Sequence, residues 1–183
     1  KKQQNCVVKI LFVGRQIPER NTPIILKAIK EISKEFTNFH LDIVGGGSHL
    51  EQYEKLCNKL ELKKFVTFHG QVVRSNIIDY IHSADFVLIP AGTETQSVFL
   101  NEAMACGKPI LAANTGGPTE YVNEDIGILI DPKNIDEWKN GIMSMINKLN
   151  EFDPIKISQT ARDNFSYISI LKKYQEIYEN LKD

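Results

Sequence analysis

Residues 85–113 read DFVLIPAGTETQSVFLNEAMACGKPILAA and contain one complete repeat of the expected fold. The apolar run at 85–89 predicts a buried strand that ends at Pro90. Residues 98–106 predict a helix that ends at Gly107, and residues 109–113 predict a second buried strand. A strand, a helix and another strand joined by short loops are typical of a parallel sheet.

The same alternation extends in both directions from this segment. Further strands are expected at 7–13, 40–44, 65–69 and 127–130, and further helices at 22–36, 48–60, 75–83 and 134–149. The pattern predicts an α/β domain with a doubly wound parallel sheet of about six strands, covered by helices on both faces. Ligands of such sheets bind beyond the carboxyl ends of the strands, so a site is expected in the loops that follow them.

Two helix starts are expected from capping residues. Thr22 is a candidate N-cap for the helix at 22–36, because Pro23 would then occupy the first helical position. Ser48 follows a run of three glycines and is a candidate cap for the helix at 48–60.

The C-terminal residues differ from the rest because no strand follows them. Residues 155–183 predict two helices broken near Ser166, and the second helix carries an apolar stripe that must pack on something. We therefore expect a domain at 1–154 and separate C-terminal helices at 155–183. The stripe contains Ile170, Leu171, Tyr174, Ile177, Tyr178 and Leu181.

The composition is ordinary for a globular protein and excludes several classes. The 183 residues are 42% hydrophobic and 25% charged with a net charge of -1, so nucleic acid is not an expected partner. No apolar run approaches the ~20 residues of a membrane helix, and no signal segment opens the sequence. Cys6, Cys57 and Cys106 form no Cys-x-x-Cys pair, which favours reduced thiols in a cytoplasmic protein. The start at Lys1, without methionine, is expected of a piece of a longer protein.

Glu102 lies in the middle of the helix at 98–106, which is apolar almost all round and is therefore expected to be buried. A buried carboxylate is costly unless a cation or hydrogen bonds satisfy it. Two explanations fit: an ion pair with a core-facing Lys or Arg, or acceptance of hydrogen bonds from a ligand diol such as a ribose.

Glu94 lies eight positions earlier, in the loop after the strand at 85–89. It could be an ordinary solvated loop residue. The helix start between Glu94 and Glu102 has free backbone N–H groups, however, and these favour phosphate oxygens. The arrangement therefore indicates sugar hydroxyls on the two carboxylates and phosphate on the backbone between them.

Other loops at the same sheet edge carry arginines and glycines. Arg15 and Arg20 follow Gly14, and guanidinium groups suit a diphosphate, although taken alone these arginines are better explained by a solvated loop. The turn at 45–47 would let a ligand approach the backbone, or would only make a tight turn. The turn at 116–120 is a third glycine turn at this edge.

No metal or nucleophile motif accompanies these residues. The histidines (His40, His49, His69 and His82) lack metal-ligand spacing, and His69 is interpreted as structural. There is no Asp-x-Asp pair of the kind that holds a divalent metal for nucleotide-sugar chemistry. We therefore expect no metal ion and no cofactor.

Four segments in order resemble glycosyltransferase family 4, retaining enzymes with two facing Rossmann-like domains (the GT-B architecture). The likeness covers nearly the whole chain, as the C-terminal domain of that family. The segments are the Gly-Arg loop at 14–20, the strand and glycine turn at 41–47, the Glu-x7-Glu segment and its helix at 94–109, and the Gly-Gly-x-x-Glu turn at 116–120.

The resemblance implies a role for each candidate residue. Glu102 would hold the ribose hydroxyls of a nucleotide sugar, and Glu94 the hydroxyls of the transferred sugar. Arg15 and Arg20 would neutralise the departing diphosphate in place of a metal ion. Further donor-binding positions are Gly14, Gly45 and Gly46, the backbone N–H groups of Gln96, Ser97 and Val98, and Gln71 and Val72 beside the base.

The sequence departs from the family pattern at three places. Arg20 replaces the usual lysine, and Asn21 replaces the glycine that commonly follows it. The loop after Glu94 reads Thr-Gln-Ser at 95–97 in place of Gly-x-Gly, which puts side chains near the sugar and phosphate. This last change is compatible with an unusual sugar specificity or with weak activity.

The expected function is metal-independent sugar transfer from a nucleotide diphosphate sugar to an unidentified glycan or lipid-linked acceptor, as in polysaccharide, lipopolysaccharide or glycolipid synthesis. The resemblance implies an N-terminal acceptor domain outside this chain, toward which the helices at 155–183 would pack. The isolated piece is therefore expected to be poorly active. Residues 70–75 offer no carboxylate for guanine and carry Arg74, which favours UDP-sugar over GDP-sugar. The expected location is the cytoplasm, with the full-length protein at the inner face of the membrane.

Two alternatives remain open at this point. A nucleotide-sugar epimerase shares the architecture but lacks the pair of Glu94 and Glu102 in this context. A non-catalytic nucleotide-sugar-binding module would follow if the altered loop at 95–97 has lost catalysis.

Overall fold

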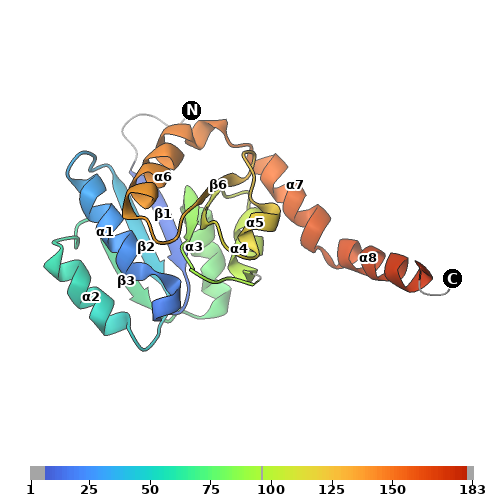
Figure 1. The fold of residues 1–183 in the computed structure, drawn as a ribbon, viewed down its shortest axis with the longest axis horizontal. Coiled ribbons are helices and arrows are strands. Elements are labelled where there is room, and N and C mark those ends of the chain that lie inside the picture. Colours follow the sequence, from blue (N-terminus) through green and yellow to red (C-terminus); the bar gives the residue numbers. More distant parts are fainter. Residues whose placement is uncertain (1–6, 96, 181–183) are drawn as a thin grey trace.

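The computed structural model describes residues 7–95 and 97–180, and these form one parallel sheet with helices on both faces (Figure 1). The strand order is β3-β2-β1-β4-β5-β6, and every pairing is parallel. This confirms the predicted Rossmann-like α/β fold. The strands are β1 (Val8–Val13), β2 (Phe39–Val44), β3 (Val66–Gly70), β4 (Phe86–Ile89), β5 (Ile110–Ala113) and β6 (Gly127–Ile130).

The helices divide between the two faces of the sheet. One face packs on α1 (Thr22–Ser33), α2 (Leu50–Lys59) and α6 (Ile135–Lys148), and the other on α3 (Ile77–Ser83), α4 (Val98–Ala105) and α7 (Pro154–Phe165). Alternation within β1 shows the division, because Ile10 and Phe12 join the first core cluster while Leu11 joins the second. The remaining elements are η1 (Pro18–Arg20), η2 (Arg74–Asn76), α5 (Pro118–Tyr121), η3 (Leu149–Glu151) and α8 (Tyr167–Asn180).

Both capping predictions were wrong. The N-cap of α1 is Asn21, whose φ of 54° lies in the left-handed region, while Thr22 is the first helical residue and is fully buried. The N-cap position of α2 is His49, and the hydroxyl of Ser48 bonds to its ring. Helix α1 begins one residue earlier than predicted and α2 one residue later, and both expected cap hydroxyls are engaged elsewhere, Thr22 with Gln16 and Ser48 with His49.

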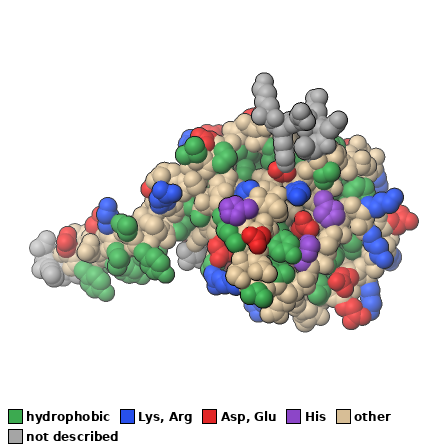
Figure 2. Space-filling view, turned by 180° about the vertical axis from the view of Figure 1, so that it is seen from behind, with side chains coloured by type: hydrophobic (Ala, Val, Ile, Leu, Met, Phe, Trp, Pro, Cys, Tyr) green, Lys and Arg blue, Asp and Glu red, His purple; other side chains and the backbone are tan. Residues whose placement is uncertain are grey.

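The two C-terminal helices are packed to very different degrees. In α7, Ile157 and Ala161 are buried against α4, whereas α8 contains no buried residue and projects away from the body (Figure 1). Its apolar side chains form a green strip on the projecting helix in Figure 2; Leu171 is 60% exposed and Tyr178 65%. Leu181, the last residue of the predicted stripe, lies outside the described residues. The predicted break at Ser166 is confirmed, and the division of the chain at residue 154 remains a prediction. Within the residues described, no helix is both long and apolar enough to cross a membrane.

Truncating the chain after residue 166 is expected to change the free energy of unfolding by less than about 0.5 kcal/mol, because surface residues without buried contacts contribute little. The measurement is urea unfolding of both chains. Truncation after residue 153 is the matched comparison: it removes Ile157 and Ala161 as well, and burial of one isoleucine alone contributes about 1.5–3 kcal/mol. Equal losses from the two truncations would contradict the account.

Candidate functional site

The site lies where the chain reverses direction across the sheet, between β1 and β4. Strand order runs from β1 outward to β3 and then resumes at β4 on the other side of β1. Loops that follow two such strands diverge to opposite faces and leave a crevice at their carboxyl ends. These ends lie along the lower edge of the sheet in Figure 1. The crevice is bounded by the loop at 14–20 on one side and by residues 90–95 on the other.

Arg20 and Glu94 meet across this crevice. Arg20 Nη1 donates to Glu94 Oε2 in an ion pair whose side chains are 27% and 10% exposed. The residues are 74 positions apart in sequence, and it is the adjacency of β1 and β4 that brings them together. A partly buried, hydrogen-bonded pair of this kind is held more firmly than an exposed one.

Two buried side-chain hydrogen bonds support the loop at 14–20, which carries Arg15 and Arg20. Gln16 Nε2 donates to the carbonyl of Gly14 at 2.8 Å, and Thr22 Oγ1 donates to Gln16 Oε1 at 2.9 Å. Gln16 and Thr22 are both 0% exposed. From the sequence, Gln16 had no predicted role and Thr22 was interpreted only as a helix cap, because nothing in the local pattern indicates a bond between the two side chains.

The glycine turn at 45–47 packs directly on that loop. Gly45 has a φ of 135°, and a Cβ there would overlap the carbonyl of Gly14; a Cβ at Gly47 would overlap Gln16. The backbone N–H of Gln16 donates to the carbonyl of Gly46 at 2.9 Å. Glycine is therefore required here by the contact between two loops of the protein itself.

Glu94 is fixed from its other side by the turn at 116–120. Gly117 N–H donates to the Glu94 carbonyl at 2.8 Å, and a Cβ on Gly116 would overlap that carbonyl oxygen. Thr115 Oγ1 donates to the carbonyl of Ala91 at 3.1 Å in the same loop. The Glu94 backbone is thus clamped between the turn after β5 and the crevice.

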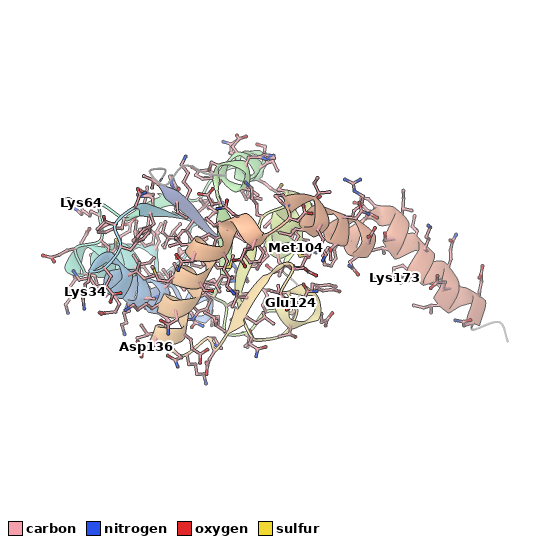
Figure 3. The ribbon with its side chains drawn as sticks, turned by 90° about the horizontal axis from the view of Figure 1, so that it is seen from above. Lys34, Lys64, Met104, Glu124, Asp136 and Lys173 are labelled. Atoms are coloured by element: carbon pink, nitrogen blue, oxygen red, sulfur yellow. The ribbon has the colours of Figure 1, made fainter. Side chains whose placement is uncertain are left out.

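The expectation that Glu102 is buried was wrong. Helix α4 buries only the side that carries Leu100, Ala103 and Met104 (Met104 is labelled in Figure 3), whereas Val98 is 58% exposed and the Glu102 side chain 35%. On the other side of α4, Val98 and Phe99 line a pocket, and Phe99 also packs against the core. Glu102 Oε1 accepts from Arg74 Nη2 at 3.0 Å, and this arginine is exposed at the rim rather than core-facing.

Two adjoining hollows bring most of the predicted residues together. The first has a volume of about 440 Å³ and the second about 420 Å³, within the size range of small-molecule sites. The first is lined by Val13, Gly14, Arg20, Val72, Arg74, Ile77, Glu94, Ser97, Val98, Phe99 and Glu102. The second is lined by Val13, Gly14, Arg15, Val44, Gly45, Gly46, Gly47, Gln71, Val72 and Ile77. Gln96 lies outside the described residues.

The start of α4 faces the first hollow. Ser97 is its N-cap, and the Ser97 hydroxyl accepts from the N–H of Leu100 at 3.3 Å. Ser97, Val98 and Phe99 all line the hollow, so the positive end of the helix dipole is directed at it. Arg20 and this helix start together give the crevice groups suited to an anion.

Histidine and cysteine side chains are used within the fold. His69 Nε2 lies 2.7 Å from Asp42 Oδ1 and its Nδ1 lies 3.2 Å from the Tyr80 hydroxyl, so both ring nitrogens are engaged. Histidine side chains gather around an acidic one on the face seen in Figure 2.

Burial raises the pKa of the Cys57 and Cys106 thiols, which disfavours the reactive thiolate. In the part of the chain that the structure describes, no group of three or more His, Cys, Asp or Glu residues is placed to hold a metal ion.

The fold defines the class: a Rossmann-like α/β domain that matches GT-B glycosyltransferase structures. HepE of Anabaena, solved in complex with UDP, superposes with a TM-score of 0.77 at 24% identity, covering 97% of this chain and 49% of that one. At this identity the likeness establishes the fold.

The sequence model of the family "Glycosyl transferases group 1" matches residues 4–162, and the chain belongs to that family. An uncharacterized glycosyltransferase of Methanocaldococcus jannaschii is 28% identical over 173 residues, 93% of this chain and 44% of the relative. A D-inositol 3-phosphate glycosyltransferase of Rhodococcus jostii is 29% identical over 147 residues, 76% of this chain and 32% of the relative. The chain therefore spans less than half the length of these curated relatives.

Proposed function

We propose that this chain is the donor-binding domain of a retaining glycosyltransferase that transfers a sugar from a nucleotide diphosphate sugar. One observation carries the proposal: two carboxylates, each paired with an arginine, stand on either side of a helix start at the edge of one pocket. A nucleotide diphosphate sugar offers hydroxyl groups at both ends and a diphosphate between them. The arrangement of charges in the pocket matches that order.

Glu102 is proposed to bind the ribose. Arg74 occupies one oxygen, Oε1, through a single hydrogen bond, and a carboxylate has about four lone-pair sites. Oε2 and part of Oε1 therefore stay free for two vicinal hydroxyl groups. Val72 and Ile77 supply an apolar wall beside this position, on which a base can lie.

Glu94 and Arg20 are proposed to act at the other end of the donor. Glu94 would accept hydroxyl groups of the transferred sugar, while Arg20 would bind the β-phosphate beside it. Arg15 and the N–H groups at the start of α4 would add to the stabilisation of the leaving diphosphate without a metal ion. Positive groups placed in advance where charge develops lower the barrier to departure of that group.

The acceptor and any general base are proposed to lie in the remainder of a longer protein. The chain covers 44% and 32% of the two relatives above, which leaves room for a second domain. We place the full-length enzyme in polysaccharide, lipopolysaccharide or glycolipid synthesis, in the cytoplasm or at the inner face of the membrane. UDP-sugar is the preferred donor in this proposal, supported by Arg74 at the rim and by UDP in the HepE complex.

A thermal-shift panel of UDP, GDP, ADP and their sugars tests the proposal. A ligand at about 100 times its dissociation constant adds about 2.7 kcal/mol to stability, which for a domain of this size raises Tm by roughly 5–10 °C. We expect the largest shift with UDP and its sugars. The absence of a shift with every nucleotide would overturn the proposal.

Activity of a full-length enzyme separates transfer from its alternatives. Transfer predicts release of free UDP together with a glycosylated acceptor of retained configuration. Epimerised sugar would identify an epimerase, and tight donor binding with neither transfer nor hydrolysis would identify a binding module.

A further inference from the structure

Asn21 occupies a position that joins the two loops of the crevice. It lies between η1 and α1 with φ 54° and ψ 25°, a left-handed conformation that asparagine adopts more readily than most residues. Its side chain makes no capping bond to α1. Instead, Asn21 Nδ2 donates to the carbonyl of Pro90 at 2.9 Å, in the loop that leads to Glu94.

A second bond between the loops lies on the other side of Arg20. The backbone N–H of Gly92 donates to the carbonyl of Glu19 at 3.0 Å. Both chain neighbours of Arg20 are therefore bonded to the segment that carries Glu94. A Cβ on Gly92 would come within 3.2 Å of Asn21 Nδ2, so the loops are in close contact at this point.

The Glu94 loop is consequently held from two directions. Thr115, Gly116 and Gly117 hold it on the β5 side, as described above, and Asn21 and Glu19 hold it on the β1 side. The contacts on the β5 side fix where Glu94 lies. Of these contacts, those on the β1 side are the ones that join the Glu94 loop directly to the chain neighbours of Arg20.

We propose that Asn21 is a positioning residue, which sets the Arg20 guanidinium against Glu94 and thereby against the diphosphate of the donor. The position of Arg20 relative to the diphosphate rests on the proposed function. A glycine at this position would adopt the same backbone conformation but would leave the Pro90 carbonyl without the side-chain donor. Compared with glycine, the asparagine restricts the backbone at position 21 and adds a direct hydrogen bond to Pro90 in the Glu94 loop.

Asn21→Gly is the informative variant, because glycine keeps the left-handed backbone and removes only the amide. By calorimetry, we expect UDP to bind about 5- to 10-fold more weakly, the effect of one hydrogen bond. The affinity for UMP should change less than about 2-fold, because UMP lacks the β-phosphate that Arg20 is proposed to bind. In the Arg20→Gln background, Asn21→Gly should no longer affect UDP binding, because its effect acts through Arg20.

A measurement without ligand tests the geometry separately. Urea unfolding of Arg20→Gln, Glu94→Gln and the double variant gives the coupling free energy between the two side chains. This coupling free energy is measured in the wild-type and Asn21→Gly backgrounds. Asn21→Asp is a second background, which keeps the side-chain volume but loses the N–H donor. We expect the coupling to fall by more than half in both variants. Unchanged coupling would overturn the inference whether or not UDP binds, as would equal weakening of UDP and UMP. Loss of coupling in a protein that binds no nucleotide would uphold the positioning role and reject the proposed function.

Discussion

Glu102→Ala is expected to weaken UDP binding by about 10- to 100-fold, the loss of roughly 1.5–3 kcal/mol that accompanies removal of a charged hydrogen-bond partner. The expected loss falls on binding and not on folding, since the Glu102 side chain is 35% exposed and its partner Arg74 is already 80% exposed. The variant should therefore keep the free energy of unfolding of the parent within about 0.5 kcal/mol. Calorimetric titration and urea unfolding measure the two quantities.

Two controls make this result specific to the ribose. Glu124→Ala removes an exposed glutamate in the loop before β6 (labelled in Figure 3), outside the lining of both hollows, and should leave the affinity unchanged. A 2′,3′-dideoxy analogue of UDP should bind wild type and Glu102→Ala with similar affinity, because the hydroxyl groups that distinguish them are gone. A variant that loses affinity equally for UDP and this analogue would show that Glu102 does not act on the ribose.

Gly116→Ala is expected to lower the free energy of unfolding by more than about 2 kcal/mol and to reduce binding of the nucleotide sugar. Its φ of 55° already strains a residue with a Cβ by about 1–2 kcal/mol. The added methyl group would also overlap the Glu94 carbonyl, so the turn at 116–120 and the Glu94 loop must separate. Urea unfolding and titration with UDP-sugar measure both consequences.

Gly70→Ala is the matched comparison for this prediction. Gly70 has a similar φ of 63°, but the nearest atom to its hypothetical Cβ, Leu50 Cδ2, is 4.0 Å away. The loss in free energy of unfolding of Gly70→Ala therefore measures the backbone strain alone. The additional loss in Gly116→Ala measures the clash with Glu94. If both variants lose the same stability, the contact between Gly116 and Glu94 has no energetic weight.

The sheet could be predicted from the sequence because each strand is a short apolar run between helices of regular spacing. The pairing of Arg20 with Glu94 could not be predicted, because the hydrophobic periodicity of a single segment does not determine which strands lie side by side. The position of β1 beside β4 is decided by packing of the whole sheet. Local sequence supplies both residues but not their distance.

Predictions about individual helices failed where a tertiary contact competes with composition. Val98 looks like a core residue in the sequence of α4, yet it is 58% exposed and lines a pocket that a ligand would fill. Thr22 looks like a cap, yet its hydroxyl is engaged with Gln16 and the chain enters α1 from a left-handed Asn21. In each case the side chain serves the loop architecture of the site, which is where local rules are expected to give way.

The two ion pairs at the pocket also bear on how a charged ligand would approach it. Arg20, Glu94, Arg74 and Glu102 together carry no net charge, and Arg15 in the adjoining hollow adds one positive charge. Such a balanced surface produces little long-range attraction, so encounter with an anionic nucleotide would depend only weakly on ionic strength. Discrimination would then arise after contact, when Arg20 bonds to the phosphate beside Glu94, and would be expressed in the rate at which the ligand leaves.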